Sequence, residues 1–197
     1  MSKRAPEFLQ VIRSETKSLH DSLEELVGGN NLMSDDPDPA VYRNLIMAQY
    51  QFHNFVAEHI RLSFANEEHN VLDWPDCRRI TNLKADLNDF ETTVITSLID
   101  KDVDINPNPA FSLGLCYVAE GSAMGNKMLF NHLKDKLGIL GVSDLKFLKN
   151  EGIDFGLRWK EFIQLMLVYN QKDDENLLSG VIHGYKSFRS MFLIAKN

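Results

Sequence analysis

Two groups of residues in this chain have types and spacings that could do chemistry. The first follows steps of three and four, which place its members on one face of a helix: Arg13, Thr16, His20 and Glu24. A histidine one turn before a glutamate can bind a metal through one ring nitrogen while the other faces the carboxylate, directly or through water. The same spacing is common on solvated helix faces, so this group alone leaves both interpretations open.

The second group is a pair of glycines, Gly121 and Gly125, in a stretch whose apolar residues recur at helical steps. A glycine inside a helix costs roughly 1 kcal/mol relative to alanine. Two glycines four residues apart leave one helix face without side chains. Either another helix or a planar ligand could approach such a face closely. Combined with the histidine, the bare face fits a haem, which needs an axial ligand on one side and room for a small ligand on the other.

Helices must position both groups, because apolar residues recur with helical period and no clear period-two alternation occurs. We therefore predict an all-α fold of about seven or eight helices with short connections, in one domain spanning residues 1–197. The expected helices cover residues 5–27, 39–64, 77–87 with a possible continuation to 99, 111–137, a short one within 143–152, 157–169 and 175–195.

Composition restricts the class of protein further. A hydrophobic content of 44% and a charged content of 25% are typical of a globular chain. The net charge of −7 speaks against nucleic acid as a partner. The sequence has neither a long apolar run nor an apolar signal core, so we expect no membrane association and a cytoplasmic location. Cys77 and Cys116 lie far apart, which disfavours a disulfide or a zinc site.

Both groups resemble the motifs of one family. The pattern R-x-x-T-x-x-x-H-x-x-x-E, from Arg13 to Glu24, resembles the proximal-helix motif of haem oxygenases. Residues 116–126, CYVAEGSAMGN, resemble the distal-helix motif of the bacterial, biliverdin-producing members, which read close to YVxEGSxxGG. The order of the motifs, their separation and the chain length also match, so the resemblance covers nearly the whole chain.

The resemblance implies a haem-oxygenase-like bundle with haem held between the two motif helices. His20 would be the axial ligand of the iron, with Glu24 behind it. Gly121 and Gly125 would lie over the distal face and direct bound O₂ toward one meso carbon, and Ser122 would lie near a distal water network. The reaction would be O₂-dependent cleavage of haem to biliverdin, CO and free iron. Haem is then both substrate and cofactor, and the protein supplies position and electrostatics.

Other residues would complete the binding site for haem. Its anionic propionates need cations at the mouth of the site. The candidates for contact with haem are Arg13, Thr16, Lys17, Tyr117, Asn126, Lys186 and Arg189. Asn126 departs from the family pattern, which commonly has a second glycine there, and its amide could shift the site or donate to a bound ligand.

The expected partners follow from the same resemblance. Electrons would come from a reductase, a ferredoxin or another external donor such as ascorbate. The biliverdin could supply a bilin-binding photoreceptor, or the reaction could serve iron acquisition. Two other functions stay open at this point. One is a haem-binding or haem-sensing protein of the same fold that does not turn over. The other is a thiaminase-like enzyme, which would need a catalytic cysteine such as Cys116.

Overall fold

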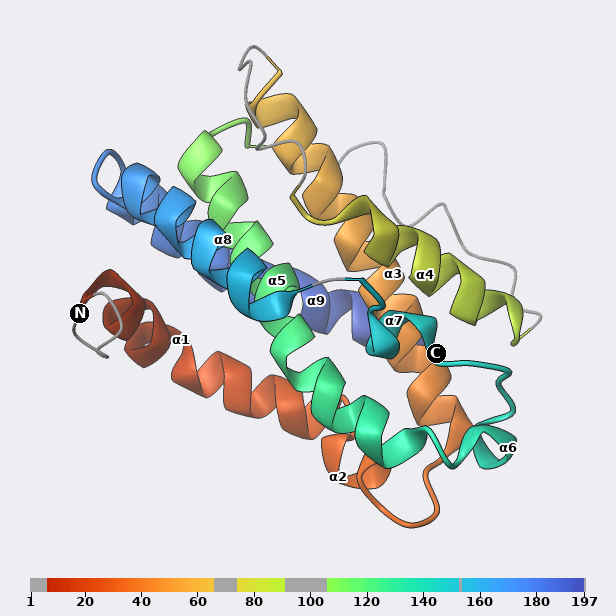
Figure 1. Ribbon diagram of the computed structural model, residues 1–197. Helices are drawn as coiled ribbons and strands as arrows, with labels where there is room; N and C mark the ends of the chain where they lie inside the picture. Colours follow the sequence, from red (N-terminus) through yellow and green to blue (C-terminus); the bar gives the residue numbers. More distant parts are fainter. Residues whose placement is uncertain (1–6, 66–73, 91–105, 153, 197) are drawn as a thin grey trace.

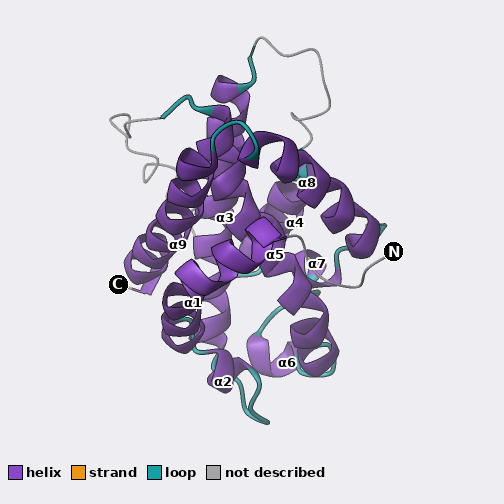
Figure 2. Cartoon of the chain, turned by 90° about the vertical axis from the view of Figure 1, so that its left-hand side faces the viewer, coloured by secondary structure: helices purple, strands orange, loops and turns teal. Residues whose placement is uncertain are grey.

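A computed structural model describes residues 7–65, 74–90, 106–152 and 154–196. All regular secondary structure in these ranges is helical (Figure 2). The elements are α1 Glu7–Leu26, α2 Gly29–Leu32, α3 Pro39–Ser63, α4 Cys77–Asn88, α5 Pro109–Leu133, α6 Leu137–Leu140, α7 Lys146–Lys149, α8 Phe155–Asn170 and α9 Asp174–Lys196. The predicted all-α class is therefore confirmed. None of these helices has both the length and the apolar character needed to cross a bilayer.

The predicted helix bounds agree with the structure except around single turns. The described residues hold nine helices, because the segments after Gly28 and around Gly138 form one-turn helices where we predicted only breaks. For the same reason the helix predicted to end at Leu137 ends at Leu133, and Leu137 begins the one-turn helix α6. The possible continuation of the third helix to residue 99 lies outside the described residues.

Polar side chains fix the starts of the long helices. Asp38 accepts a hydrogen bond from the backbone N–H of Ala40 at 2.8 Å, and Pro39 follows as the first helical residue of α3. Asn108 does the same for α5 by accepting from the N–H of Phe111 at 3.0 Å, again before a proline. The helix that carries the two glycines thus begins at Pro109, two residues earlier than predicted.

The centre of the molecule is a close crossing of α5 and α9 (Figure 1). A Cβ atom added at Gly114 would lie 2.2 Å from the carbonyl oxygen of Leu177, and one at Gly180 would lie 2.1 Å from that of Phe111. These distances are far below contact distance, so only glycine permits the two backbones to approach this closely. The crossing fixes α5 against α9.

The first helix packs against the same central pair through α9. Its buried stripe consists of Phe8, Leu9, Ile12 and Thr16, and α1 packs on α9. In Figure 1, α1 runs along one side of the α5–α9 pair, and α3 and α4 lie on the other. Helix α9 is therefore the common support of the two helices that carry the predicted site.

Candidate functional site

The second predicted motif lies where α5 leaves the core. Every residue of α5 from Ala110 to Glu120 is buried. Beyond this point the helix has an exposed side, on which the side chains of Met124 and Met128 are 59% and 62% exposed. Exposed methionines one turn apart beside two glycines form an apolar surface of the kind that a planar hydrophobic ligand could cover.

The structure separates the two interpretations of the glycines. Among the described residues, a Cβ atom added at Gly125 would meet nothing within 4 Å, and one at Gly121 would meet only Trp159 Cη2, at 3.8 Å. Close helix packing is instead carried by Gly114 and Gly180, described above. Helices α1 and α5 are also not among the pairs that pack closely in the described part of the chain. The face of Gly121 and Gly125 is thus open, as a ligand-binding face would be.

This open face is directed toward the first part of the chain. His132 lies seven residues after Gly125 and therefore on the same side of α5. Its Nε2 atom is 2.7 Å from the carbonyl oxygen of Ser34, and the Lys136 ammonium donates to the same oxygen at 2.7 Å. Ser34 lies two residues after the end of α2, so these contacts join the end of α5 to the segment after α1 and α2.

His20 lies on α1 with its side chain 52% exposed. Its Nδ1 atom is 3.8 Å from a carboxylate oxygen of Glu24 and 3.8 Å from one of Asp21. Both distances are longer than a hydrogen bond, but they place two negative groups on the Nδ1 side of the ring. Nε2 is then the nitrogen whose lone pair is available to a metal. Asp21 was not a sequence candidate, because its spacing from His20 does not place it one turn away.

Tyr185 on α9 contacts two residues of the first motif. Its ring meets the His20 ring edge-on, with centroids 6.1 Å apart, and its hydroxyl hydrogen-bonds the side chain of Thr16. Burial raises the pKa of Tyr185 to about 12, with the nearby Tyr117 contributing. Thr16 donates its own proton to the carbonyl oxygen of Ile12 at 2.7 Å, so Tyr185 is the donor to Thr16. Tyr185 is not among the candidates that the sequence predicts, although the neighbouring Lys186 is.

The remaining candidates on α5 are partly or fully buried. Ser122 donates its hydroxyl proton to the carbonyl oxygen of Ala119 at 2.8 Å, which leaves its oxygen free to accept. Asn126 is 6% exposed, and its Nδ2 atom has no hydrogen-bond partner among the described residues. Tyr117 is 7% exposed and packs against Trp159, with ring centroids 5.5 Å apart. A role for Asn126 toward a ligand stays a prediction.

The basic candidates lie on the exposed surfaces of two helices, α1 and α9. Lys17 pairs with Asp21 on the exposed surface of α1. Arg13 is exposed on the same helix, and Lys186 and Arg189 are exposed on α9. Their assignment to the propionate groups of haem stays a prediction.

Cys116 does not fit the role of a nucleophile. The residue is fully buried, and burial raises the pKa of its thiol well above 9.0. A reactive cysteine needs the opposite, a lowered pKa and access to substrate. The thiaminase-like alternative therefore has no support from this side chain.

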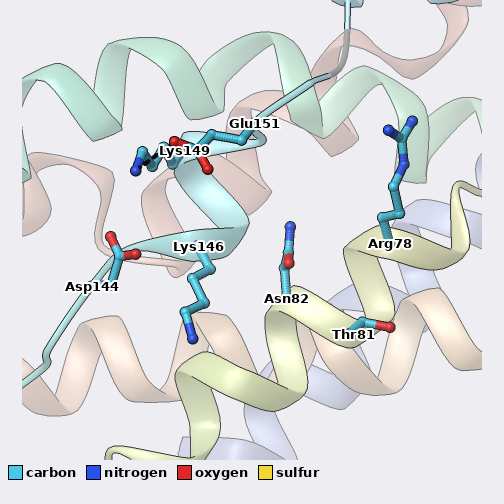
Figure 3. Close-up of a pocket in the computed structure, with 7 residues that line it drawn as sticks. All are labelled: Arg78, Thr81, Asn82, Asp144, Lys146, Lys149 and Glu151. Carbon is cyan, nitrogen blue, oxygen red and sulfur yellow. Dashed lines mark ion pairs between the residues drawn. The ribbon is translucent and has the colours of Figure 1, made fainter.

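A polar hollow between α4 and α7 lies away from both motifs. Its volume is about 290 Å³, and its lining consists of Arg78, Thr81, Asn82, Asp144, Lys146, Lys149 and Glu151 (Figure 3). Lys149 is neutralised by Glu151 at 2.7 Å, and Arg78 by Asp76 at 2.6 Å. In Figure 3, Arg78 and Lys146 point in different directions, so the hollow does not present convergent charges.

The described residues form an all-helical protein with a histidine on α1 and a glycine face on α5 that is open at Gly125. The "Heme oxygenase" family model matches residues 6–193, which is nearly the whole chain. The chain therefore belongs to the heme oxygenase family. A comparison with curated proteins gave no match.

Proposed function

We propose that this protein is an active haem oxygenase, with a single domain over residues 1–197 that cleaves haem to biliverdin, CO and free iron. Membership of the family supports a haem-degrading function in general. The observation that carries the proposal is the open face of α5, where a Cβ atom at Gly125 would meet nothing within 4 Å. Backbone that no described residue covers, as at Gly125, is what a flat macrocycle requires.

In this proposal each motif residue has a defined task. His20 would bind the iron through Nε2, while Glu24 and Asp21 hold the Nδ1 side of the ring. The backbone at Gly121 and Gly125 would lie over the other face of the haem and leave room for O₂. The exposed Met124 and Met128 would cover apolar parts of the macrocycle. When bound, haem supplies the redox chemistry, and the protein supplies orientation and exclusion of water.

The proposal also includes the partners and the setting of the reaction. Electrons would come from an external donor, a reductase, a ferredoxin or ascorbate. The product would serve a bilin-binding protein, or the released iron would serve nutrition. The expected cytoplasmic location stays a prediction.

The deciding experiment is a haem titration followed by turnover. Purified protein is loaded with haem, and its Soret absorption is followed under air after addition of ascorbate or a reductase with NADPH. Loss of the Soret band, rise of a biliverdin absorption and capture of CO by deoxymyoglobin support the oxygenase. His20→Ala is the matched control, which should not turn over.

The competing function is a haem-binding or haem-sensing protein that does not turn over. Asn126 favours it, because a buried amide with an unpartnered nitrogen stands where the family commonly has glycine. A stable spectrum of the reduced protein under air would support this alternative and contradict the oxygenase. Asn126→Gly then tests the cause, since recovery of bilin formation would assign the block to this side chain.

A further inference from the structure

A buried ion cluster lies directly behind the open glycine face. Glu120, the residue before Gly121, is 3% exposed. One of its oxygens is 3.0 Å from Arg79 Nη2, and Arg158 contacts both oxygens, at 3.1 and 3.2 Å. Arg79 comes from α4 and Arg158 from α8, so the carboxylate connects α5 to two other helices.

The cluster is itself held in place from outside α5. Arg158 Nη1 is 3.8 Å from Asp76, the residue that caps α4, and its guanidinium lies over the Trp74 ring at 3.7 Å from the centroid. Arg79 is fully buried and lies over the Phe155 ring at 5.6 Å. The two-oxygen contact of Arg158 with Glu120 restricts the direction of approach as well as the distance.

The same cluster reaches the backbone of α5. Arg79 Nη1 donates to the carbonyl oxygen of Ala119 at 3.2 Å, and Ser122 donates to that oxygen at 2.8 Å. The Ala119 carbonyl oxygen therefore accepts two side-chain hydrogen bonds in addition to its place in the helical hydrogen-bond pattern. The peptide that precedes the glycine face is therefore held by a side chain from α4.

A helix face without side chains must be held in position by contacts on the other sides of the helix. Gly121 and Gly125 have no side chains that could fix the helix from the side of the ligand, and around Gly125 there is open space. The position of the backbone there must be set from behind. Buried ion pairs contribute little net stability compared with apolar packing, so specifying a position is a better account of this cluster than adding stability.

We propose that Glu120, Arg79 and Arg158 are positioning residues that fix the rotation and depth of α5 at the glycine face. The proposal rests on the proposed function, because the backbone at Gly121 and Gly125 would then determine which meso carbon of the haem is opened. None of the three residues needs to touch the haem.

The test compares Arg158→Lys, which keeps the charge but removes the two-oxygen contact, and Glu120→Gln, which keeps the shape but removes the charge. The matched control is Asp86→Asn, because Asp86 is equally buried but joins α4 to the backbone of Lys146 and Phe147 rather than to α5. Amide hydrogen exchange of residues 119–128 is measured on the haem-free proteins, and bilin isomers are separated after turnover.

We expect about tenfold faster exchange of residues 119–128 in Arg158→Lys, without global unfolding, and a changed isomer ratio. Asp86→Asn should leave both unchanged even where it lowers the melting temperature. The proposal would be overturned if Arg158→Lys showed the same amide exchange rates and the same bilin isomer ratio as the wild-type protein. If Glu120→Gln does not fold, Arg158→Lys alone decides. If the wild-type protein forms no bilin, the proposed function fails, and the exchange data still decide whether the cluster positions α5.

Discussion

The ring of Tyr185 meets the ring of His20 edge-on, at an interplanar angle of 74° and a centroid distance of 6.1 Å. Through its hydroxyl the same tyrosine bonds Thr16, one turn earlier on α1. One side chain of α9 therefore holds two turns of the first helix and limits the orientations open to the imidazole. Since the pKa of Tyr185 is raised to about 12, the hydroxyl stays a donor throughout the neutral range.

Two substitutions at Tyr185 should separate its ring from its hydroxyl. Tyr185→Phe loses the bond to Thr16 and should lower the unfolding free energy by about 1 kcal/mol, with haem affinity nearly unchanged. Tyr185→Leu also loses the ring edge beside His20 and should weaken haem binding several-fold. Urea unfolding and haem titration measure the two effects. Wild-type haem affinity in Tyr185→Leu would show that the ring does not orient His20.

His20→Ala should abolish haem turnover while the helical fold remains. The side chain is half exposed, and its polar contacts in the described part of the chain are with Asp21 and Glu24 of the same helix, so its removal should cost little stability. Circular dichroism measures the fold, and the Soret position with added haem reports the ligand. Added imidazole should restore part of the Soret spectrum by binding the iron in place of the missing His20 side chain. A native spectrum without imidazole would contradict the assignment of His20.

The glycines should respond to substitution in opposite ways. Gly125→Ala should stabilise the haem-free protein by up to about 1 kcal/mol, because alanine favours the helix and the site is open. Gly125→Leu should fold but lose haem binding or change the bilin isomer. Gly114→Ala should cost about 3 kcal/mol, because its Cβ atom would lie 2.2 Å from the Leu177 oxygen. Thermal unfolding and product analysis measure these outcomes. Normal haem turnover with one unchanged isomer in Gly125→Leu would argue that this face does not meet the macrocycle.

The pH dependence of stability should contain a contribution from Asp86. Burial raises the pKa of this carboxyl from 3.8 to about 6, against the opposing effect of two backbone N–H donors. The folded state therefore binds more protons than the unfolded state between about pH 4 and 6, so this group's contribution to stability falls as pH rises through that window. The pKa difference corresponds to about 3 kcal/mol.

Asp86→Asn isolates that contribution because other carboxyl groups titrate in the same range. The unfolding free energy of the wild-type protein minus that of the variant should decrease from pH 4 to pH 6 and stay constant above it. A difference that does not change with pH would mean that the carboxyl titrates alike in both states.

The sequence predicts the helices well where local chemistry determines them. Asp38-Pro39 marks the start of α3 correctly, because a capping aspartate and a first-turn proline act within three residues. The Asn108-Pro109 pair works in the same way at α5, but it lies in a stretch whose turn residues predict a loop. One-turn helices such as α2 and α6 were missed because glycine also signals a helix end.

The site was only partly predictable for a different reason. Gly121 and Gly114 are both helical glycines in the same element, and nothing in their local sequence tells which one meets another backbone. That distinction depends on the crossing of α5 with α9, a contact between residues far apart in the chain. Tyr185 was missed for the same reason, since its partners Thr16 and His20 lie on the first helix.

The glycine crossing of α5 and α9 has a consequence for how the protein meets its substrate. Because α9 supports α1 through Tyr185 and α5 through Gly114 and Gly180, the spacing between the two helices is determined by a rigid third element. If haem binds between α1 and α5 as proposed, the haem-free chain already holds these two helices at a fixed spacing, and little conformational entropy should be lost on binding. The free energy of haem binding would then not be reduced by a cost of ordering the helices around the ligand.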